Sequence, residues 1–219
     1  MELGKVTKKY MPEDPTIEEA YKLLRTNLLY TPDLKIITVT STTANEGKTT
    51  TSFYLAKSFA EIGKKVVIVD CDLRKGTLRK FFNIQEAVGG LSEYLSKQSD
   101  NFIYETDIDN LYVVFSGQYP PNPTELLTST YFERLMKMLR KVFDIVIVDT
   151  TPIGVGADGA LAARLSDGVV MVVRNNYISK KRVKKSKIAL ERHGTKVIGV
   201  VFNRIKKHQS DYNEYYYYG

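Results

Sequence analysis

Short apolar runs rich in β-branched residues recur along the chain at wide intervals. Most of them are continuously apolar rather than alternating, which is typical of strands covered on both faces of a sheet. We therefore expect strands at Ile36–Thr40, Val66–Asp70, Leu111–Phe115, Ile145–Asp149, Val169–Val173 and Val197–Phe202.

Helical stretches separate several of these strands, at Lys48–Ile62, Thr124–Lys141 and Ser179–His193. Alternation of strand and helix is typical of βαβ units, whose strands are parallel. The pattern predicts a three-layer α/β domain with a mostly parallel central sheet.

Two segments lie outside the alternation. The first, Pro15–Tyr30, reads as an amphipathic helix before the first strand, with Leu23, Leu24 and Leu28 as its apolar set. The second follows Ile205, has no apolar core positions and ends in tyrosines, so we expect it to be mobile. The expected organisation is one folded domain over 1–204, including the helix at about 15–30, and a flexible tail over 205–219.

Composition narrows the class of protein. The 219 residues include 32 Lys and Arg against 25 Asp and Glu, a formal net charge of +7, and a single cysteine, Cys71. One cysteine rules out an internal disulfide framework and fits a reducing compartment. No apolar run approaches the roughly 20 residues that span a bilayer.

The densest basic stretch, 179–187, is expected to be a helix with Val183 and Ile188 facing inward. Its basic side chains form either a solvated face or a surface that binds anionic lipid, an acidic partner or nucleic acid.

A phosphate-binding loop follows the first expected strand. Ser41–Thr50 ends in Gly47-Lys48-Thr49-Thr50 and leads into a helix, the context in which a P-loop binds phosphate. Thr42 occupies the place of the usual first glycine. We expect Asn45, Glu46 and the amides of Gly47–Thr50 to bind the nucleotide, Lys48 to reach the β- and γ-phosphates, and the Thr49 hydroxyl to ligate Mg²⁺.

Three carboxylates close two further strands. Asp70 and Asp72 end one strand and Asp149 ends another, and ligands bind beyond the carboxyl ends of parallel strands. The loop and the carboxylates together predict an Mg²⁺–nucleotide site. Asp70 and Asp149 are assigned to the metal with Thr49; either Asp70 or Asp72 would act as base. Asn203 and Arg204, after the last strand, are expected at the nucleotide base or in a simple turn.

These motifs resemble those of the bacterial protein-tyrosine kinases. The resemblance rests on a degenerate Walker A at Ser41–Thr50, a Walker A′ ending in Asp70-Cys71-Asp72-Leu73-Arg74 and a Walker B ending in Asp149-Thr150-Thr151-Pro152. It covers essentially the whole chain. Glu19, Lys22 and Arg25 resemble the family's E-x-x-R-x-x-R self-association motif, with lysine in the middle place. The family's C-terminal tyrosine cluster is matched by Tyr212, Tyr215, Tyr216, Tyr217 and Tyr218.

The resemblance implies a P-loop NTPase fold of the SIMIBI type, shared with MinD and ParA, and catalytic roles for Lys48, Asp70, Asp72 and Asp149. It implies an ATP- and Mg²⁺-dependent tyrosine kinase that phosphorylates its own tail and regulates capsular or extracellular polysaccharide synthesis and export. Implied partners are further copies in a ring-like homo-oligomer, a membrane-bound polysaccharide co-polymerase whose cytoplasmic segment activates the kinase, protein-tyrosine substrates and a cognate tyrosine phosphatase. The expected location is the cytoplasm, with recruitment to the inner face of the plasma membrane.

Two other functions compete with this interpretation. A partition or division-site ATPase of the same fold commonly carries a second lysine early in the phosphate loop, where this chain has Thr43, and lacks a tyrosine cluster. A nucleotide-gated scaffold would bind a polymerisation partner without significant kinase activity. Intact Lys48, Asp70, Asp72 and Asp149 favour the kinase, and no nucleic-acid partner is expected.

Overall fold

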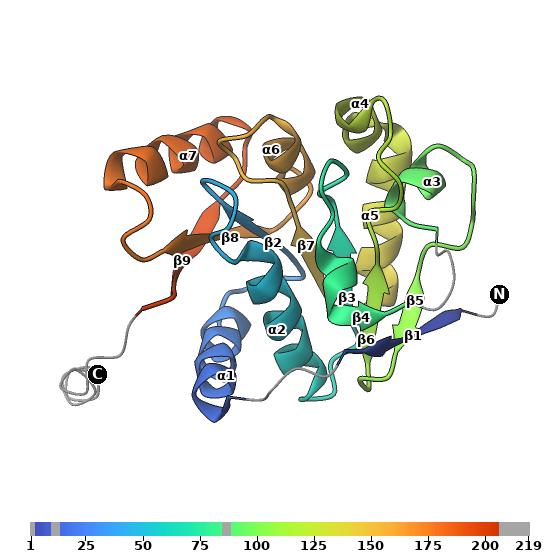
Figure 1. Cartoon of the computed structure of the whole chain (residues 1–219), viewed down its shortest axis with the longest axis horizontal. Coiled ribbons are helices and arrows are strands. Elements are labelled where there is room, and N and C mark those ends of the chain that lie inside the picture. The colour runs from blue at the N-terminus through green and yellow to red at the C-terminus, as the bar shows by residue number, and fades with distance from the viewer. Residues whose placement is uncertain (1–2, 10–13, 85–88, 206–219) are drawn as a thin grey trace.

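A nine-stranded sheet runs through the described part of the chain, with helices on both faces (Figure 1). The structure is a computed structural model that describes residues 3–9, 14–84 and 89–205. The strand order is β4-β1-β5-β6-β3-β7-β2-β8-β9. The strands are β1 (Gly4–Lys8), β2 (Ile36–Ser41), β3 (Val66–Asp70), β4 (Phe82–Asn83), β5 (Tyr104–Thr106), β6 (Leu111–Val114), β7 (Ile145–Asp149), β8 (Gly168–Arg174) and β9 (Val197–Asn203).

The six strands from β6 to β9 in this order are all parallel, as the strand–helix alternation predicts. Antiparallel pairing occurs only toward the other edge of the described sheet, between β5 and β6 and between β1 and β4. Alternate residues of β3 enter different cores: Val66 and Ile68 face one layer of helices, and Val67 and Val69 face the other. The predicted three-layer α/β architecture is confirmed.

The helices form two layers. On one face, α1 and α2 pack through Leu28, Phe53 and Phe59. On the other face α5 packs through Phe132 and Leu135, and α6 and α7 follow it toward the β9 edge of the sheet (Figure 1). The helices are α1 (Pro15–Leu29), α2 (Lys48–Ala60), α3 (Leu91–Leu95), α4 (Pro123–Thr128), α5 (Thr130–Val142), α6 (Asp158–Ala163) and α7 (Lys180–Arg192), with a 3₁₀ helix, η1, at Leu78–Phe81.

The helix expected at Thr124–Lys141 is two helices in the structure. Ser129 separates α4 from α5 with an extended backbone, at φ −71° and ψ 154°. Its hydroxyl donates to the Leu126 carbonyl at 2.7 Å, and its oxygen accepts from the Phe132 N–H at 3.2 Å. Because serine satisfies free backbone groups at both helix ends, the chain breaks there despite a continuous helical pattern.

Two predicted inward positions are wrong. Leu23 is 61% exposed and Ile188 is 40% exposed. In α1 the inward stripe contains Tyr21, Leu24 and Leu28, and in α7 it contains Val183, Ser186 and Leu190. Both stripes follow i, i+3, i+7 spacing, which leaves the two mispredicted residues off the contact line.

The last strand also departs from prediction, because it is not covered on both faces. β9 ends the sheet, and Val200 and Phe202 are 45% and 63% exposed. An apolar sequence alone does not tell an edge strand from a central one.

The basic stretch forms α7, and its basic side chains all point away from the core. Lys187 pairs with Glu191 at 2.5 Å. The exposed set is Lys180, Lys181, Arg182, Lys184, Lys185 and Lys187. Among the described residues, no helix combines the length and apolar character needed to span a bilayer.

Candidate nucleotide and phosphoryl-transfer site

The loop between β2 and α2 has the backbone geometry of a phosphate cradle. Asn45 and Gly47 both have positive φ, 64° and 96°. A Cβ at Gly47 would lie 2.0 Å from Nδ2 of Asn203, so only glycine fits between the loop and the end of β9. The following residues open α2, whose first N–H groups point back toward the loop.

Glu46 holds this loop to its neighbours. Its buried carboxylate accepts from the N–H of Thr43 at 2.6 Å and from the N–H of Arg174, the last residue of β8, at 3.1 Å. Its carbonyl oxygen accepts from Nδ2 of Asn203 at 2.9 Å. The Glu46 side chain therefore supports the loop from behind and does not line the cleft described below, and Thr43 belongs to the same network.

The segment after β7 supports the start of the loop. The N–H of Ile153 donates to the Ser41 carbonyl and that of Gly154 to the Thr42 carbonyl, both at 2.9 Å. A Cβ at Gly154 would lie 2.5 Å from the Thr42 oxygen, so this close approach needs glycine. Sequence reasoning missed Gly154, whose only signal is its position five residues after the acidic strand end.

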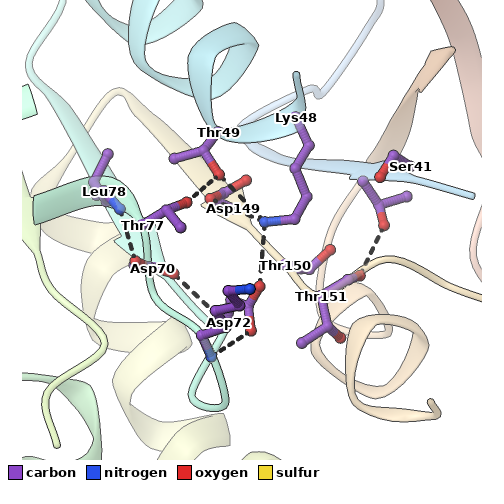
Figure 2. Close-up of polar contacts among 12 residues, drawn as sticks. Ser41, Lys48, Thr49, Asp70, Asp72, Thr77, Leu78, Asp149, Thr150 and Thr151 are labelled. Atoms are coloured by element: carbon purple, nitrogen blue, oxygen red, sulfur yellow. Dashed lines mark hydrogen bonds and ion pairs between the residues drawn. The ribbon is translucent and has the colours of Figure 1, made fainter. Parts of the chain in front are cut away.

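The three predicted carboxylates gather at one edge of the sheet around Lys48 (Figure 2). Asp70 of β3 pairs in register with Asp149 of β7, which confirms the expected meeting of the strand ends. The Nζ of Lys48 lies 3.3 Å from Oδ2 of Asp72 and 3.7 Å from Oδ2 of Asp149. Burial lowers the pKa of Lys48, but the charges of Asp149, Asp72 and Asp70 outweigh burial and raise its pKa, so the ammonium stays charged.

Asp70 and Asp72 differ in their partners. Oδ1 of Asp70 accepts from the Asp72 N–H at 3.1 Å, and Oδ2 accepts from the Leu78 N–H at 3.2 Å. Burial, followed by the charge of Asp149, raises the pKa of Asp70 to about 8. Asp72 instead lines the cleft described below. Of the two candidates for the base, only Asp72 lines this cleft.

The hydroxyl of Thr49 lies beside the carboxylate of Asp149, one oxygen of which has no hydrogen bond in the described structure. Oδ1 of Asp149 accepts from the Ser52 hydroxyl at 3.1 Å, while its buried Oδ2 makes no hydrogen bond. Burial raises the pKa of Asp149. The Thr49 hydroxyl contacts the Thr77 hydroxyl at 2.9 Å, a neighbour that the sequence did not indicate. These oxygens fit Mg²⁺, which is usually held by one or two carboxylates together with phosphates. Within the described residues, no group of three or more His, Cys, Asp or Glu could hold a metal alone.

A cleft of about 530 Å³ opens above these groups. Of the predicted site residues, those that line it are Asn45, Gly47, Lys48, Thr49, Thr50, Asp72 and Arg204. Four others support the site from behind: Glu46, Asp70, Asp149 and Asn203. The remaining lining residues are Ala44, Arg74, Lys75, Thr77, Lys80, Phe81, Thr151, Pro152 and Val155. Asn203, predicted at the nucleotide base, thus bonds the phosphate loop, and Arg204 alone of that pair faces the cleft.

Arg74 is fixed at the rim of the cleft. Its Nε donates to Oδ2 of Asp158 at 2.5 Å, and Oδ1 of Asp158 accepts from the Thr124 hydroxyl at 2.6 Å. Hydrogen bonding to Asp158 raises the pKa of Arg74 further. This network joins the loop after β3 to the start of α6 and to α4, so Arg74 holds these segments together at the rim of the cleft.

The residues that resemble the family's self-association motif lie on α1. Glu19 and Lys22 are exposed and form an ion pair of 3.7 Å within the helix. Nη1 of Arg25 donates to the Ser58 carbonyl of α2 at 2.7 Å, so this side chain is used inside the domain. The predicted phosphoacceptors, Tyr212 and Tyr215–Tyr218, lie outside the described residues.

Comparisons with known proteins agree with this geometry. The family model described as an AAA domain matches residues 34–192. The chain is 42% identical to the tyrosine-protein kinase CpsD of Streptococcus pneumoniae over 205 residues, covering 92% of this chain and 90% of that protein. It is 37% identical to the tyrosine-protein kinase YwqD of Bacillus subtilis, covering 92% and 86%. The crystal structure of the chimerical protein CapA2B2 superposes with a TM-score of 0.84 at 37% identity, covering 94% of each chain.

Relatives named as kinases favour tyrosine phosphorylation over the partition-ATPase alternative, and the nucleotide-binding fold extends over the whole described domain. The phosphate loop, the acidic strand ends and these similarities over nine-tenths of the chain lead to one assignment: the chain belongs to the bacterial tyrosine-protein kinases, enzymes built on a P-loop ATPase fold.

Proposed function

We propose that this kinase uses Mg²⁺-ATP to phosphorylate its own C-terminal tyrosines and thereby regulates the synthesis and export of a capsular or extracellular polysaccharide. The observation that carries the proposal is the position of Asp72, which faces the cleft beside Lys48 while Asp70 and Asp149 are buried behind it. The acceptors are Tyr212, Tyr215, Tyr216, Tyr217 and Tyr218.

The chain's own residues divide the work of transfer. Lys48 and the amides of Gly47–Thr50 would bind the β- and γ-phosphates, and the Thr49 hydroxyl with Asp149 would hold Mg²⁺, directly or through water. Bound Mg²⁺ would neutralise charge on the phosphate oxygens. When Lys48 turns from Asp72 to the phosphates, the Asp72 carboxylate loses its counter-ion and becomes free to accept a proton.

In the proposed transfer step, one bond to the γ-phosphorus forms as another breaks. The tyrosine oxygen forms a bond to the γ-phosphorus as the bond from that phosphorus to the β–γ bridging oxygen breaks, and ADP departs. The phenolic proton passes to Asp72. Asp70 keeps the loop after β3 in place through the Leu78 N–H and orients Asp72 through its N–H. Arg204, which lines the cleft, would contact the nucleotide base.

Regulation follows from the family resemblance. We place this kinase at the inner membrane face, bound to the cytoplasmic segment of a membrane-bound co-polymerase that activates it. Copies associate through Glu19 and Lys22 on α1, and a cognate tyrosine phosphatase resets the tail. The folded domain ends near residue 204 and the tail follows it.

Purified protein incubated with Mg²⁺-ATP tests the proposal. Mass spectrometry should find phosphotyrosine within 212–218, and none when EDTA is added. A chain that binds nucleotide but never acquires phosphotyrosine, with or without an activator segment, would instead be the nucleotide-gated scaffold.

A further inference from the structure

One wall of the cleft carries two lysines that pair with no carboxylate in the described part of the chain. Lys75 and Lys80 line the cleft and are exposed. Neither side chain forms an ion pair with any of the described residues, which are 3–9, 14–84 and 89–205. The other cations on this side are committed, since Lys48 faces Asp72 and Arg74 binds Asp158.

The two lysines belong to the side of the cleft that holds the base. They follow β3, as Asp72 does, and Thr77 between them contacts the Thr49 hydroxyl at 2.9 Å. The opposite end of the cleft is marked by Arg204, after β9. Four strand spacings separate β3 from β9 in the sheet, about 19 Å at roughly 4.8 Å each. A nucleotide whose base lies toward Arg204 leaves the β3 wall open to the acceptor.

The β3 wall also offers an apolar surface. Phe81 lines the cleft beside Lys80 and is fixed by stacking on Phe53, with ring centroids 4.6 Å apart. A held aromatic ring next to two free ammonium groups suits a ligand that combines a ring with negative charge.

We propose that Lys75, Lys80 and Phe81 form an acceptor subsite that selects tyrosines flanked by acidic residues. The inference rests on the proposed kinase function and adds the substrate class of the same site. The tail has this chemistry: Asp211 directly precedes Tyr212, and Glu214 directly precedes Tyr215.

Peptide kinetics with the full chain test the subsite. One synthetic peptide carries Ser-Asp-Tyr-Asn-Glu-Tyr, and its neutral counterpart has Asn and Gln in place of Asp and Glu. The enzymes are the wild type, the double variant Lys75→Gln/Lys80→Gln and a matched control, Lys180→Gln/Lys184→Gln, which removes the same charge from α7. Nucleotide affinity is measured in parallel with a fluorescent ATP analogue.

For the wild type, kcat/KM should be about 5- to 20-fold higher with the acidic peptide than with the neutral one, because the acidic peptide has the lower KM. This difference should shrink at high salt. In the double variant, the ratio of the two kcat/KM values should fall close to one, while its affinity for the nucleotide analogue changes by less than about twofold. The control variant should keep the wild-type preference for the acidic peptide. Equal use of both peptides by the wild type, or failure to use either while the tail is phosphorylated, would overturn the subsite. So would weaker nucleotide binding in the double variant, because the lysines would then serve phosphates. Absence of phosphotyrosine on peptide and tail alike would strike the kinase proposal itself.

Discussion

Lys48 sits between two sets of partners, the carboxylates of Asp72 and Asp149 and the phosphates it is proposed to bind. We expect Lys48→Met to lower autophosphorylation at least about 100-fold, because a fixed charge on the transferred group is lost. The structure adds a second effect. Since Lys48 is buried against two acids, the variant should fold but be less stable at pH 7.5. Because burial raises the pKa of Asp149, stability should partly recover toward pH 5 as this carboxylate becomes protonated.

Phosphotyrosine immunoblotting and thermal unfolding at both pH values measure these effects. Lys64→Met makes the same change at an exposed position and should alter neither. Near-normal phosphotyrosine in Lys48→Met would remove this loop from the mechanism.

Asp70 gives the free energy of unfolding a pH dependence. Folding raises its pKa from 3.8 to about 8, so its contribution to stability is complete below about pH 4 and is lost as the pH rises through about 8. In Asp70→Asn, the free energy of unfolding should therefore fall less between pH 5 and 8 than in the wild type, by at least about 1 kcal/mol, since one pKa unit corresponds to about 1.4 kcal/mol. Loss of one acceptor for the Leu78 or Asp72 N–H adds a constant offset, so the slope is the observable.

Urea unfolding in EDTA at several pH values provides that slope. The exposed Asp109→Asn is the control and should follow the wild type. Parallel slopes for Asp70→Asn and the wild type would show that Asp70 ionises normally in the folded chain.

At the scale of elements, one glutamate joins the phosphate loop to β8. Glu46→Ala removes the acceptor shared by the Thr43 and Arg174 N–H groups. Hydrogen bonds to a charged group contribute about 1.5–3 kcal/mol each, so we expect ATP-analogue affinity to fall at least about tenfold. Glu46→Gln should lose less, because it keeps one oxygen acceptor.

Fluorescence titration measures this affinity, and the exposed Glu125→Ala serves as the control. Unchanged affinity in Glu46→Ala would mean that the loop keeps its shape without this side chain. The same network explains why Asn203, at the far edge strand, matters to a loop that follows β2.

At the scale of the whole molecule, we expect the tail to be phosphorylated by a neighbouring copy. A Lys48→Met chain mixed with an active chain whose tail tyrosines are all phenylalanine should acquire phosphotyrosine. Five phosphates would add roughly −7.5 to −10 charges against the formal +7, so light scattering should show a smaller assembly after phosphorylation. An inactive chain that stays unmodified would exclude transfer between copies, and an unchanged mass would exclude disassembly.

The structure also selects the variants for testing association. Glu19→Ala/Lys22→Ala changes exposed side chains only, whereas Arg25→Ala would remove the bond to the Ser58 carbonyl and loosen α1 from α2. A smaller assembly in the double variant alone supports a direct role of α1 at the contact.

Local sequence patterns were sufficient to predict much of the fold of this protein. The six neighbouring strands from β6 to β9, their parallel arrangement and the phosphate loop follow from apolar runs, helix spacing and Gly47-Lys48-Thr49, because each signal lies within one segment. The strands β1, β4 and β5 were missed, since they are defined by their pairing partners rather than by composition. The tail remains a sequence-based prediction.

The sequence alone determined that Asp70, Asp72 and Asp149 would meet at one edge, since strand ends in a parallel sheet share an edge. Only the tertiary structure decided their roles: packing buries Asp70 against the Leu78 N–H and leaves Asp72 facing the cleft. The same holds for Asn203, whose partner Glu46 is 157 residues away. Contacts between distant segments depend on how the layers pack, and no local pattern encodes which side chain is left facing the substrate.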